Sequence, residues 1–459
     1  MGTITTQQSE LKTGLSEVKT NGYKIHPEEV QNTLRKYMLV DGFDFTLDLE
    51  ESQGAYLYDS KHKKRLLDFF TFVASNPLGM NHPKMNNEEF IRKIGKVALS
   101  KPSLSDVYSQ VQAEFVDTFF KTAVPSYFKY SFFVEGGTLA VENALKTAFD
   151  WKVRKNFKKG YKEEKGQQII HFKEAFHGRS GYCLSMTNTD PNKILYFPKF
   201  KWPRILNPKV KFPLNDENLK TVIGAEETAV NQIKQALHDN KDDIAALIIE
   251  PIQGEGGDNQ FRKEFFIKLR ELCDENEMLL IFDEVQTGIA LTGKWWAHQH
   301  YVQPDIISFG KKTQVCGILS TNRIDDVEEN VFRKPTRINS TWGGNMVDMF
   351  RFKKILEIIK EEELVENCRI QGEYLQKRMN DLTVKYPDKL SNARGLGLFC
   401  AFDCKTPELR NKIVSKCFDE GMMVLGCGEK TLRFRPPLII KQEEIETGIE
   451  ILDNVIAAL

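Results

Sequence analysis

The chain has 459 residues, of which 41% are hydrophobic and 28% are charged, as in an ordinary globular protein. This composition excludes a disordered or fibrous chain. Its 64 basic and 64 acidic residues balance, so no net field draws it to nucleic acid or to an anionic membrane.

The N-terminal segment, residues 1–20, is polar and has neither the apolar core nor the cleavage site of a signal peptide. The longest apolar runs further along are only strand-sized, so we expect no membrane span. The eight cysteines lie at irregular spacings, mostly inside apolar stretches, which indicates reduced, packed thiols. Cys400 and Cys404 have no partner pair of Cys or His and make a poor metal clamp. We therefore expect a cytoplasmic protein without a metal site.

A hairpin is predicted over residues 56–70, which alternate in polarity around a turn at 59–62. Between about residues 130 and 309, short β-rich runs alternate with helical stretches. The strands are expected at residues 131–134, 168–172, 246–250, 279–283 and 306–309. Strands covered by helices on both faces are continuous apolar runs, and ligands bind at their carboxyl ends. The pattern predicts a helix-covered, mostly parallel sheet.

From residue 343 the pattern changes to long helices, at 345–361 and 367–384, followed by a late strand near residue 431. This change indicates a separate C-terminal lobe. We therefore expect an α/β fold with three parts. Residues 1–75 form an N-terminal segment with the hairpin, packing on the small domain. Residues 76–342 form a large domain around the central sheet, and residues 343–459 form a smaller α+β domain.

The first candidate site is the glycine pair Gly136-Gly137, which lies between an apolar strand and a helix. Glycines here expose backbone N–H groups at a helix N-terminus, where unpaired donors and the helix dipole favour a phosphate. An ordinary strand-to-helix turn explains this segment equally well when it is taken alone.

Two later segments place charged side chains at strand ends. Asp283 ends the apolar run "LLIFD", where a carboxylate is satisfied by solvent or paired with a buried cation such as a protonated pyridine nitrogen. The run "PDIISFGKK" brings Lys311 and Lys312 to the same region if the two strands are neighbours, although a lysine there is normally a surface residue. Phosphate donors, an acid and a lysine are together what a Schiff-base cofactor requires.

On these motifs the sequence resembles the class III aminotransferases of fold type I, and within them the lysine 6-aminotransferases. The resemblance covers residues 56–437. Its motifs are Gly136-Gly137-Thr138, "EPIQGEGG" (250–257), "DEVQTG" (283–288), "FGKK" (309–312), "STWGG" (340–344) and "LRFRPP" (432–437). Residues 175–205 and 310–317 resemble the lysine enzymes in particular. The resemblance implies pyridoxal 5'-phosphate bound in the large domain. It also implies ping-pong transfer of the ε-amino group of L-lysine to 2-oxoglutarate.

The resemblance also implies cofactor contacts. Lys311 is expected to be the catalytic lysine because it directly follows the small residue that closes the strand, and Asp283 is expected to pair with the pyridine nitrogen. The other expected contacts are Gln286 with the ring hydroxyl, Phe176 stacked on the ring, and Gly136, Gly137 and Thr138 at the phosphate. The family often has Ser-Gly at Gly136-Gly137, so one hydroxyl ligand is lost here. Thr341 is expected to reach the phosphate of a neighbouring subunit's cofactor, which implies a homodimer.

Three further residues are expected to bind substrates. By the resemblance, Arg433 binds the carboxylate of 2-oxoglutarate, Glu255 covers Arg433 while lysine reacts, and Arg179 grips the distant carboxylate. A surface salt bridge is the alternative for each arginine. His177 and His298 have no carboxylate or cysteine at ligand spacing, so we expect both to be structural.

Three alternative functions, two of them enzymatic, fit the same motifs less well. Another ω-aminotransferase, acting on ornithine or 4-aminobutyrate, would keep every cofactor residue and change only the substrate pocket. A racemase or aminomutase on this fold would not need both Glu255 and Arg433. A non-catalytic protein of the same fold would not need Lys311 and Asp283.

Overall fold

The computed structural model describes residues 23–459, so the polar leader at 1–20 lies outside the described residues. A seven-stranded sheet in the order β4-β10-β9-β8-β7-β5-β6 forms its centre. Its strands are β4 (Phe128–Val134), β5 (Gln168–Phe172), β6 (Arg204–Ile205), β7 (Ile244–Ile249), β8 (Leu279–Asp283), β9 (Ile306–Phe309) and β10 (Cys316–Thr321).

The sheet is mostly parallel, as expected. Strands β6, β5, β7, β8 and β9 run in one direction, whereas β10 is antiparallel to both β9 and β4. All five expected strands are present. The sequence did not predict β10, which closes the gap between β9 and β4 directly after the lysine pair.

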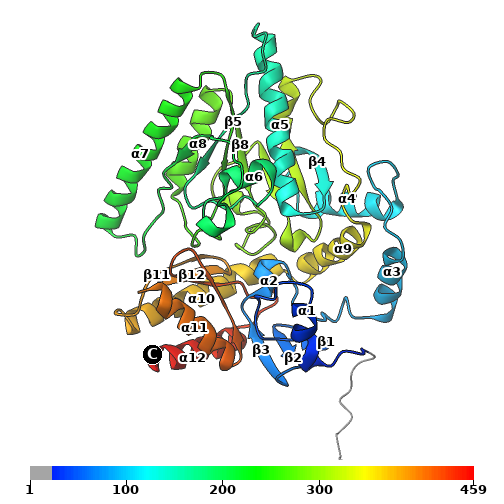
Figure 1. Cartoon of the computed structure of the whole chain (residues 1–459), viewed down its shortest axis with the longest axis vertical. Helices are drawn as coiled ribbons and strands as arrows, with labels where there is room; N and C mark the ends of the chain where they lie inside the picture. The colour runs from blue at the N-terminus through cyan, green and yellow to red at the C-terminus, as the bar shows by residue number, and fades with distance from the viewer. Residues whose placement is uncertain (1–22) are drawn as a thin grey trace, which may run out of the picture.

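Helices cover the sheet on both faces (Figure 1). They are α4 (Gln110–Thr122), α5 (Gly137–Lys158), α6 (Gly181–Met186), α7 (Asp216–Asp239) and α8 (Lys263–Glu275), whereas α3 (Glu88–Ala98) packs on the later helix α9 (Met346–Glu361). Alternate residues of β8 separate into two apolar clusters: Ile281 packs with α5, and Phe282 packs with α8. Every residue of β7 is buried, which explains its unbroken apolar run.

The C-terminal part contains a four-stranded antiparallel sheet in the order β11-β12-β15-β14. Its elements are α9 (Met346–Glu361), α10 (Leu364–Lys385), β11 (Leu390–Leu396), β12 (Phe399–Cys404), α11 (Pro407–Asp419), β13 (Met422–Met423), β14 (Leu425–Cys427), β15 (Thr431–Phe434) and α12 (Gln442–Ala457). The two long helices expected from the sequence are α9 and α10.

The N-terminal elements lie beside the C-terminal ones, below the central sheet in Figure 1. They are α1 (Val30–Arg35), β1 (Leu47–Gln53), β2 (Tyr56–Asp59), β3 (Lys64–Asp68) and the short turn α2 (Thr71–Ala74). The expected hairpin is the antiparallel pair β2 and β3. Strand β3 also pairs in parallel with β13, so the two ends of the chain share one sheet. None of the helices within residues 23–459 has the length and apolar character needed to cross a bilayer.

Candidate active site

The carboxyl ends of β8 and β9 bring the candidate acid and lysines together. The two strands are parallel neighbours, with Asp283 opposite Ser308. The Asp283 carboxylate accepts hydrogen bonds from Ser308 Oγ and from the backbone N–H of Val285, both at 3.1 Å. Lys311 follows Ser308 by three residues, so it leaves the sheet at the edge where Asp283 lies.

A cavity of about 230 Å³ lies at this edge. Six residues expected to contact the cofactor line it: Gly137, Thr138, Phe176, Asp283, Gln286 and Lys311. The sequence thus identified residues from four separate segments that the fold brings around one cavity.

The other expected contacts lie elsewhere within the described part of the chain. Gly136, Arg179 and Thr341 are exposed and do not line the cavity. Glu255 and Arg433 do not line the cavity either. They pair with each other, with Glu255 Oε2 3.1 Å from Arg433 Nη1.

The N-terminus of α5 forms one end of the cavity. This 22-residue helix begins at Gly137, and Gly136 precedes it as the N-cap residue with φ of 98°, a left-handed value that favours glycine. A Cβ added to Gly178 would lie 2.2 Å from Thr138 Oγ1, so the facing loop approaches too closely for any side chain at residue 178. The unpaired N–H groups of the first turn therefore face a tight, glycine-lined end that suits a phosphate.

His177, which was expected to be structural from the sequence, is a buried residue of the cavity lining. Its Nδ1 lies 2.8 Å from Asp283 Oδ2, and its Nε2 has no hydrogen-bond partner among residues 23–459. Local spacing did not reveal this partner, because Asp283 is 106 residues away in sequence. One signal was available: His177 follows β5 by a few residues, so it leaves the sheet at the same edge as Asp283.

His298, also expected to be structural, has a carboxylate partner that local spacing in the sequence did not reveal. Its Nδ1 lies 2.9 Å from Glu284 Oε1, and its backbone N–H also donates to that oxygen, at 2.7 Å. Both residues are buried and lie outside the cavity lining. This pair anchors the chain after β8 and contributes to structure.

The two adjacent lysines face different surroundings. Lys311 lines the cavity, and its Nζ donates to Val73 O at 3.3 Å. Lys312 lies outside the cavity, where its Nζ donates to Gln286 O at 2.7 Å and to Ala74 O at 3.3 Å. Burial lowers the pKa of Lys311 to about 8, and the charge of Arg433 adds to the effect. Burial also lowers the pKa of Lys312 well below its ordinary value, so the two lysines are distinguished by position: Lys311 lines the cavity and Lys312 does not.

Two of the carbonyl groups that accept from these lysines, Val73 O and Ala74 O, belong to an unusual turn. Residues Thr71–Ala74 have φ of 41°, 52°, 60° and 62°, so four consecutive non-glycine residues adopt the left-handed conformation. Each such residue costs roughly 1–2 kcal/mol relative to the right-handed form. Strain of this kind persists only where the surroundings enforce it, and it is concentrated at functional sites.

Glu250 is a second residue of the cavity wall that the sequence did not single out. Its carboxylate accepts from the backbone N–H of Phe176 at 2.9 Å and from that of Gly254 at 3.1 Å. Burial, followed by the charge of Asp283, raises its pKa well above the ordinary value for a glutamate. Glu250 therefore fixes the Phe176 backbone and favours a proton next to the Asp283 charge.

Glu255 lies between two cations. Its Oε2 contacts Arg433, and its Oε1 lies 2.5 Å from Lys193 Nζ. Burial raises the pKa of Glu255, but the charges of Arg433 and Lys193 outweigh burial and lower it overall. The resemblance implied the pair of Glu255 with Arg433, but Lys193 was not predicted as a second partner of Glu255.

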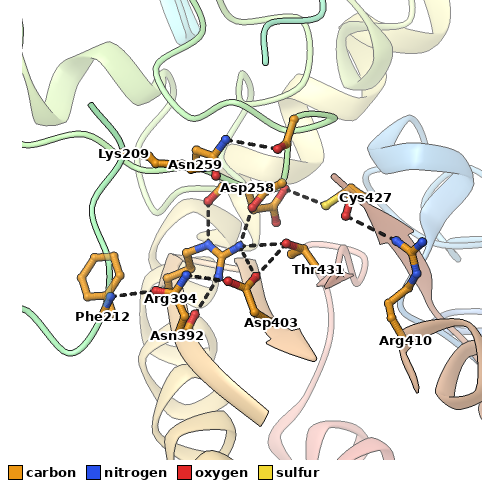
Figure 2. Close-up of polar contacts among 12 residues, drawn as sticks. Lys209, Phe212, Asp258, Asn259, Asn392, Arg394, Asp403, Arg410, Cys427 and Thr431 are labelled. Carbon is orange, nitrogen blue, oxygen red and sulfur yellow. Dashed lines mark hydrogen bonds and ion pairs between the residues drawn. The ribbon is translucent and has the colours of Figure 1, made fainter. Parts of the chain in front are cut away.

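A buried polar cluster holds the turn that carries Glu255 (Figure 2). Arg394, from β11, donates to the backbone oxygens of Gly257 and Asp258, and its Nη2 lies 2.8 Å from Asp403 Oδ1 and 3.1 Å from Thr431 Oγ1. The C-terminal sheet thereby fixes the backbone directly after Glu255.

The donor set at the cavity fits pyridoxal 5'-phosphate. The N-terminus of α5 suits the phosphate, and the Asp283 carboxylate suits a protonated ring nitrogen. Phe176 offers a flat aromatic face, and the Lys311 amine can react with an aldehyde. The glycine at residue 178 leaves the phosphate end without an obstructing side chain.

Comparison with known proteins gave three findings. Residues 37–456 match the family described as Aminotransferase class-III. The chain is 48% identical over 437 residues to the L-lysine-epsilon aminotransferase of Mycobacterium tuberculosis, covering 95% of this chain and 97% of the relative. It is 43% identical over 440 residues to the protein of the same name from Streptomyces clavuligerus, covering 95% of each chain.

One solved structure that resembles this fold is the lysine aminotransferase of M. tuberculosis in its internal aldimine form. The TM-score is 0.92 at 47% identity, and the match covers 94% of this chain and 99% of that chain.

Proposed function

Because the chain belongs to the class III aminotransferases, which use pyridoxal 5'-phosphate, we propose that it transfers the ε-amino group of L-lysine to 2-oxoglutarate. The products are 2-aminoadipate 6-semialdehyde and L-glutamate. Lysine is chosen as the substrate because the chain is similar over nearly its full length to two proteins named as L-lysine-epsilon aminotransferases.

The roles of the cavity residues follow from their positions. When bound, the cofactor supplies an aldehyde and an electron-withdrawing ring that stabilises negative charge on the reacting carbon. Asp283 keeps a proton on the ring nitrogen, because a buried carboxylate favours the charged form of a cationic neighbour. Lys311 moves the proton of the carbon that bears the reacting nitrogen. Its pKa of about 8 leaves roughly a tenth of the amine uncharged at pH 7, far more than a lysine with the ordinary pKa would have.

Glu255 and Arg433 adapt one site to two substrates. Glutamate carries a carboxylate next to its reacting carbon, whereas the reacting end of lysine carries none. Arg433 is buried, and a buried guanidinium without a partner costs several kcal/mol, so Glu255 covers it while lysine reacts. 2-Oxoglutarate then replaces Glu255 at Arg433. Arg179 binds the carboxylate at the far end of each substrate.

The protein acts as a homodimer in this proposal. Several large apolar side chains of the region before α4 are exposed in the single chain: Ile91, Leu99, Val107 and Tyr108. Such a surface is typical of a subunit interface. Thr341, which is exposed and does not line the cavity of its own chain, would then contact the cofactor phosphate of the partner.

Mixing two inactive variants tests the shared site. A Lys311→Ala subunit still supplies Thr341, and a Thr341→Ala subunit still supplies Lys311. Each mixed dimer therefore contains one intact site, so refolding the two variants together should restore activity that neither has alone. Recovery no greater than the sum of the separate activities would exclude a site shared in this way.

The substrate is tested on the purified protein. We expect a yellow protein that L-lysine bleaches and 2-oxoglutarate restores, whereas ornithine and 4-aminobutyrate leave the colour in place. Bleaching by ornithine or 4-aminobutyrate in preference to lysine would replace the substrate assignment and keep the aminotransferase activity.

Two features of organisation belong to the same proposal. We place the cofactor in a large domain of residues 76–342, between an N-terminal segment, 1–75, and a small domain, 343–459. The seven-stranded sheet lies wholly within residues 76–342, whereas the N-terminal strands share a sheet with β13 of the small domain, which supports packing of the N-terminal segment on that domain. A cytoplasmic location is supported by the eight cysteines, all of which are free and buried.

A further inference from the structure

The carboxylate of Glu255 bridges an inner and an outer cation. The inner one is Arg433, from β15, whose side chain is only 3% exposed. The outer one is Lys193, which ends the short 3-10 helix Pro191–Lys193 and has a side chain that is 25% exposed. Each cation contacts a different oxygen, at 3.1 Å and 2.5 Å respectively. One of these contacts can therefore break while the other stays.

The position of Lys193 is fixed from a second side. Its Nζ lies 5.4 Å from the centroid of the Phe176 ring, within the range of a cation–π interaction. The backbone of Phe176 is in turn anchored to the buried Glu250. Lys193 therefore contacts the ring of a cavity residue, although it does not line the cavity itself.

A movable Glu255 needs a partner in both of its positions. The proposed function, on which this inference rests, requires Glu255 to leave Arg433 when a dicarboxylate binds there. A partly buried carboxylate that loses its only cation is strongly destabilised. Glu255 avoids that loss, because Lys193 already holds its other oxygen on the more exposed side.

We propose that Lys193 is a positioning residue that retains Glu255 while Arg433 holds the substrate carboxylate. In the covered state Glu255 pairs with Arg433, and in the open state Arg433 holds the substrate carboxylate instead. Removing Lys193 destabilises the covered state less than the open state, since Glu255 still has Arg433 as a partner in the covered state. Lys193 thus strengthens the binding of 2-oxoglutarate and has little effect on the reaction with lysine, during which Glu255 stays on Arg433.

The test uses the Lys193→Met holoenzyme and glutarate, an unreactive dicarboxylate with the carbon spacing of 2-oxoglutarate. We expect the Kd of glutarate, measured from the absorbance of the bound cofactor, to rise about tenfold, as for the loss of one charge-assisted hydrogen bond. The KM for 2-oxoglutarate should rise in parallel. The rate of bleaching by lysine should change less than about twofold, since no contact of the covered state with substrate is lost. Lys193→Arg, which keeps the charge, should restore most of the glutarate affinity.

A second background shows whether Lys193 acts through Glu255. In Glu255→Gln the carboxylate is absent, so adding Lys193→Met should leave the Kd of glutarate unchanged. Lys209→Met is the matched control, because it removes a lysine–glutamate pair of the same kind, with Lys209 Nζ 2.6 Å from Glu174 Oε2. It should leave glutarate binding at the level of the unaltered protein.

Each contrary result has one meaning. An unchanged Kd in Lys193→Met, or an equal loss in the Glu255→Gln background, would overturn the role of Lys193 as the partner of Glu255. An equal loss in the reaction with lysine would also overturn it, since Lys193 would then contact lysine itself. Failure of the unaltered protein to react with lysine would instead count against the proposed function.

Discussion

His177 Nδ1 lies 2.8 Å from Asp283 Oδ2, and both side chains are buried at the edge of the central sheet. Ser308 donates to the other carboxylate oxygen at 3.1 Å. Two donors from two different strand ends therefore fix the orientation of Asp283. The Asp283 side chain, which lines the cavity, is therefore held in one orientation.

Replacing His177 tests this orientation. His177→Phe leaves Asp283 Oδ2 without its donor, and we expect kcat/KM for lysine to fall about tenfold to a hundredfold, as for other residues that orient a charged group. His177→Asn keeps a donor near Nδ1 and should retain more of the activity. Equal losses in the two variants would show that the size of the ring, and not its hydrogen bond, is what matters.

The neighbouring lysines should behave differently when each is replaced by methionine. Lys311→Met should abolish the yellow colour and lower kcat by at least about a thousandfold, since no other amine lines the cavity within residues 23–459. Lys312→Met should keep the colour, because the Lys312 amine bonds only backbone carbonyl groups outside the cavity. The absorbance spectrum and steady-state kinetics check both. A colourless Lys312→Met protein would reverse the assignment.

The lowered pKa of Lys311 predicts a pH dependence for cofactor uptake. An amine must be uncharged to react with an aldehyde, and burial lowers this pKa from 10.5 to about 8. The rate at which the apoprotein takes up pyridoxal 5'-phosphate should therefore rise with pH and level off above about pH 8. Stopped-flow absorbance measures the rate. A rate that continues to rise towards pH 10 would indicate a lysine with its ordinary pKa.

Removing Glu255 should affect the two half-reactions unequally. In Glu255→Ala the buried Arg433 loses its carboxylate partner while lysine reacts, whereas 2-oxoglutarate and glutamate bring a carboxylate of their own. We expect the lysine half-reaction to slow about tenfold or more, and the glutamate half-reaction to change much less. Single-turnover absorbance separates the two. Equal losses would show that Glu255 does not exchange with the substrate carboxylate.

The cluster around Arg394 should contribute to stability. Arg394→Met leaves Asp403 without its buried ionic partner and frees two carbonyl groups of the turn after Glu255, so the free energy of unfolding should fall by about 3–5 kcal/mol. Thr431→Val removes one neutral hydroxyl from the same cluster and should cost about 1 kcal/mol. Urea denaturation of the apoproteins measures both. Similar losses would mean that the guanidinium charge contributes little.

The sequence predicted the features of this molecule that depend on local pattern. The apolar runs located the strands of the central sheet, and the strand ends identified Asp283 and Lys311. Contacts between distant segments left no such pattern. The contact of His177 with Asp283 could not be predicted, because it forms only when the segments after β5 and β8 lie at the same edge of the folded sheet. Lys193 was missed for the same reason, since only the folded loop brings it to Glu255.

The left-handed turn at Thr71–Ala74 links two functional groups that lie far apart in sequence. Thr71 Oγ1 donates to Arg435 O at 2.7 Å, and Arg435 follows Arg433 by two residues. At its other end the same turn offers Val73 O to Lys311. The four residues of the turn thus connect the chain that follows Arg433 with the amine of Lys311. The backbone that follows Arg433 and the Lys311 amine therefore share one support, because both bond to residues of the same turn.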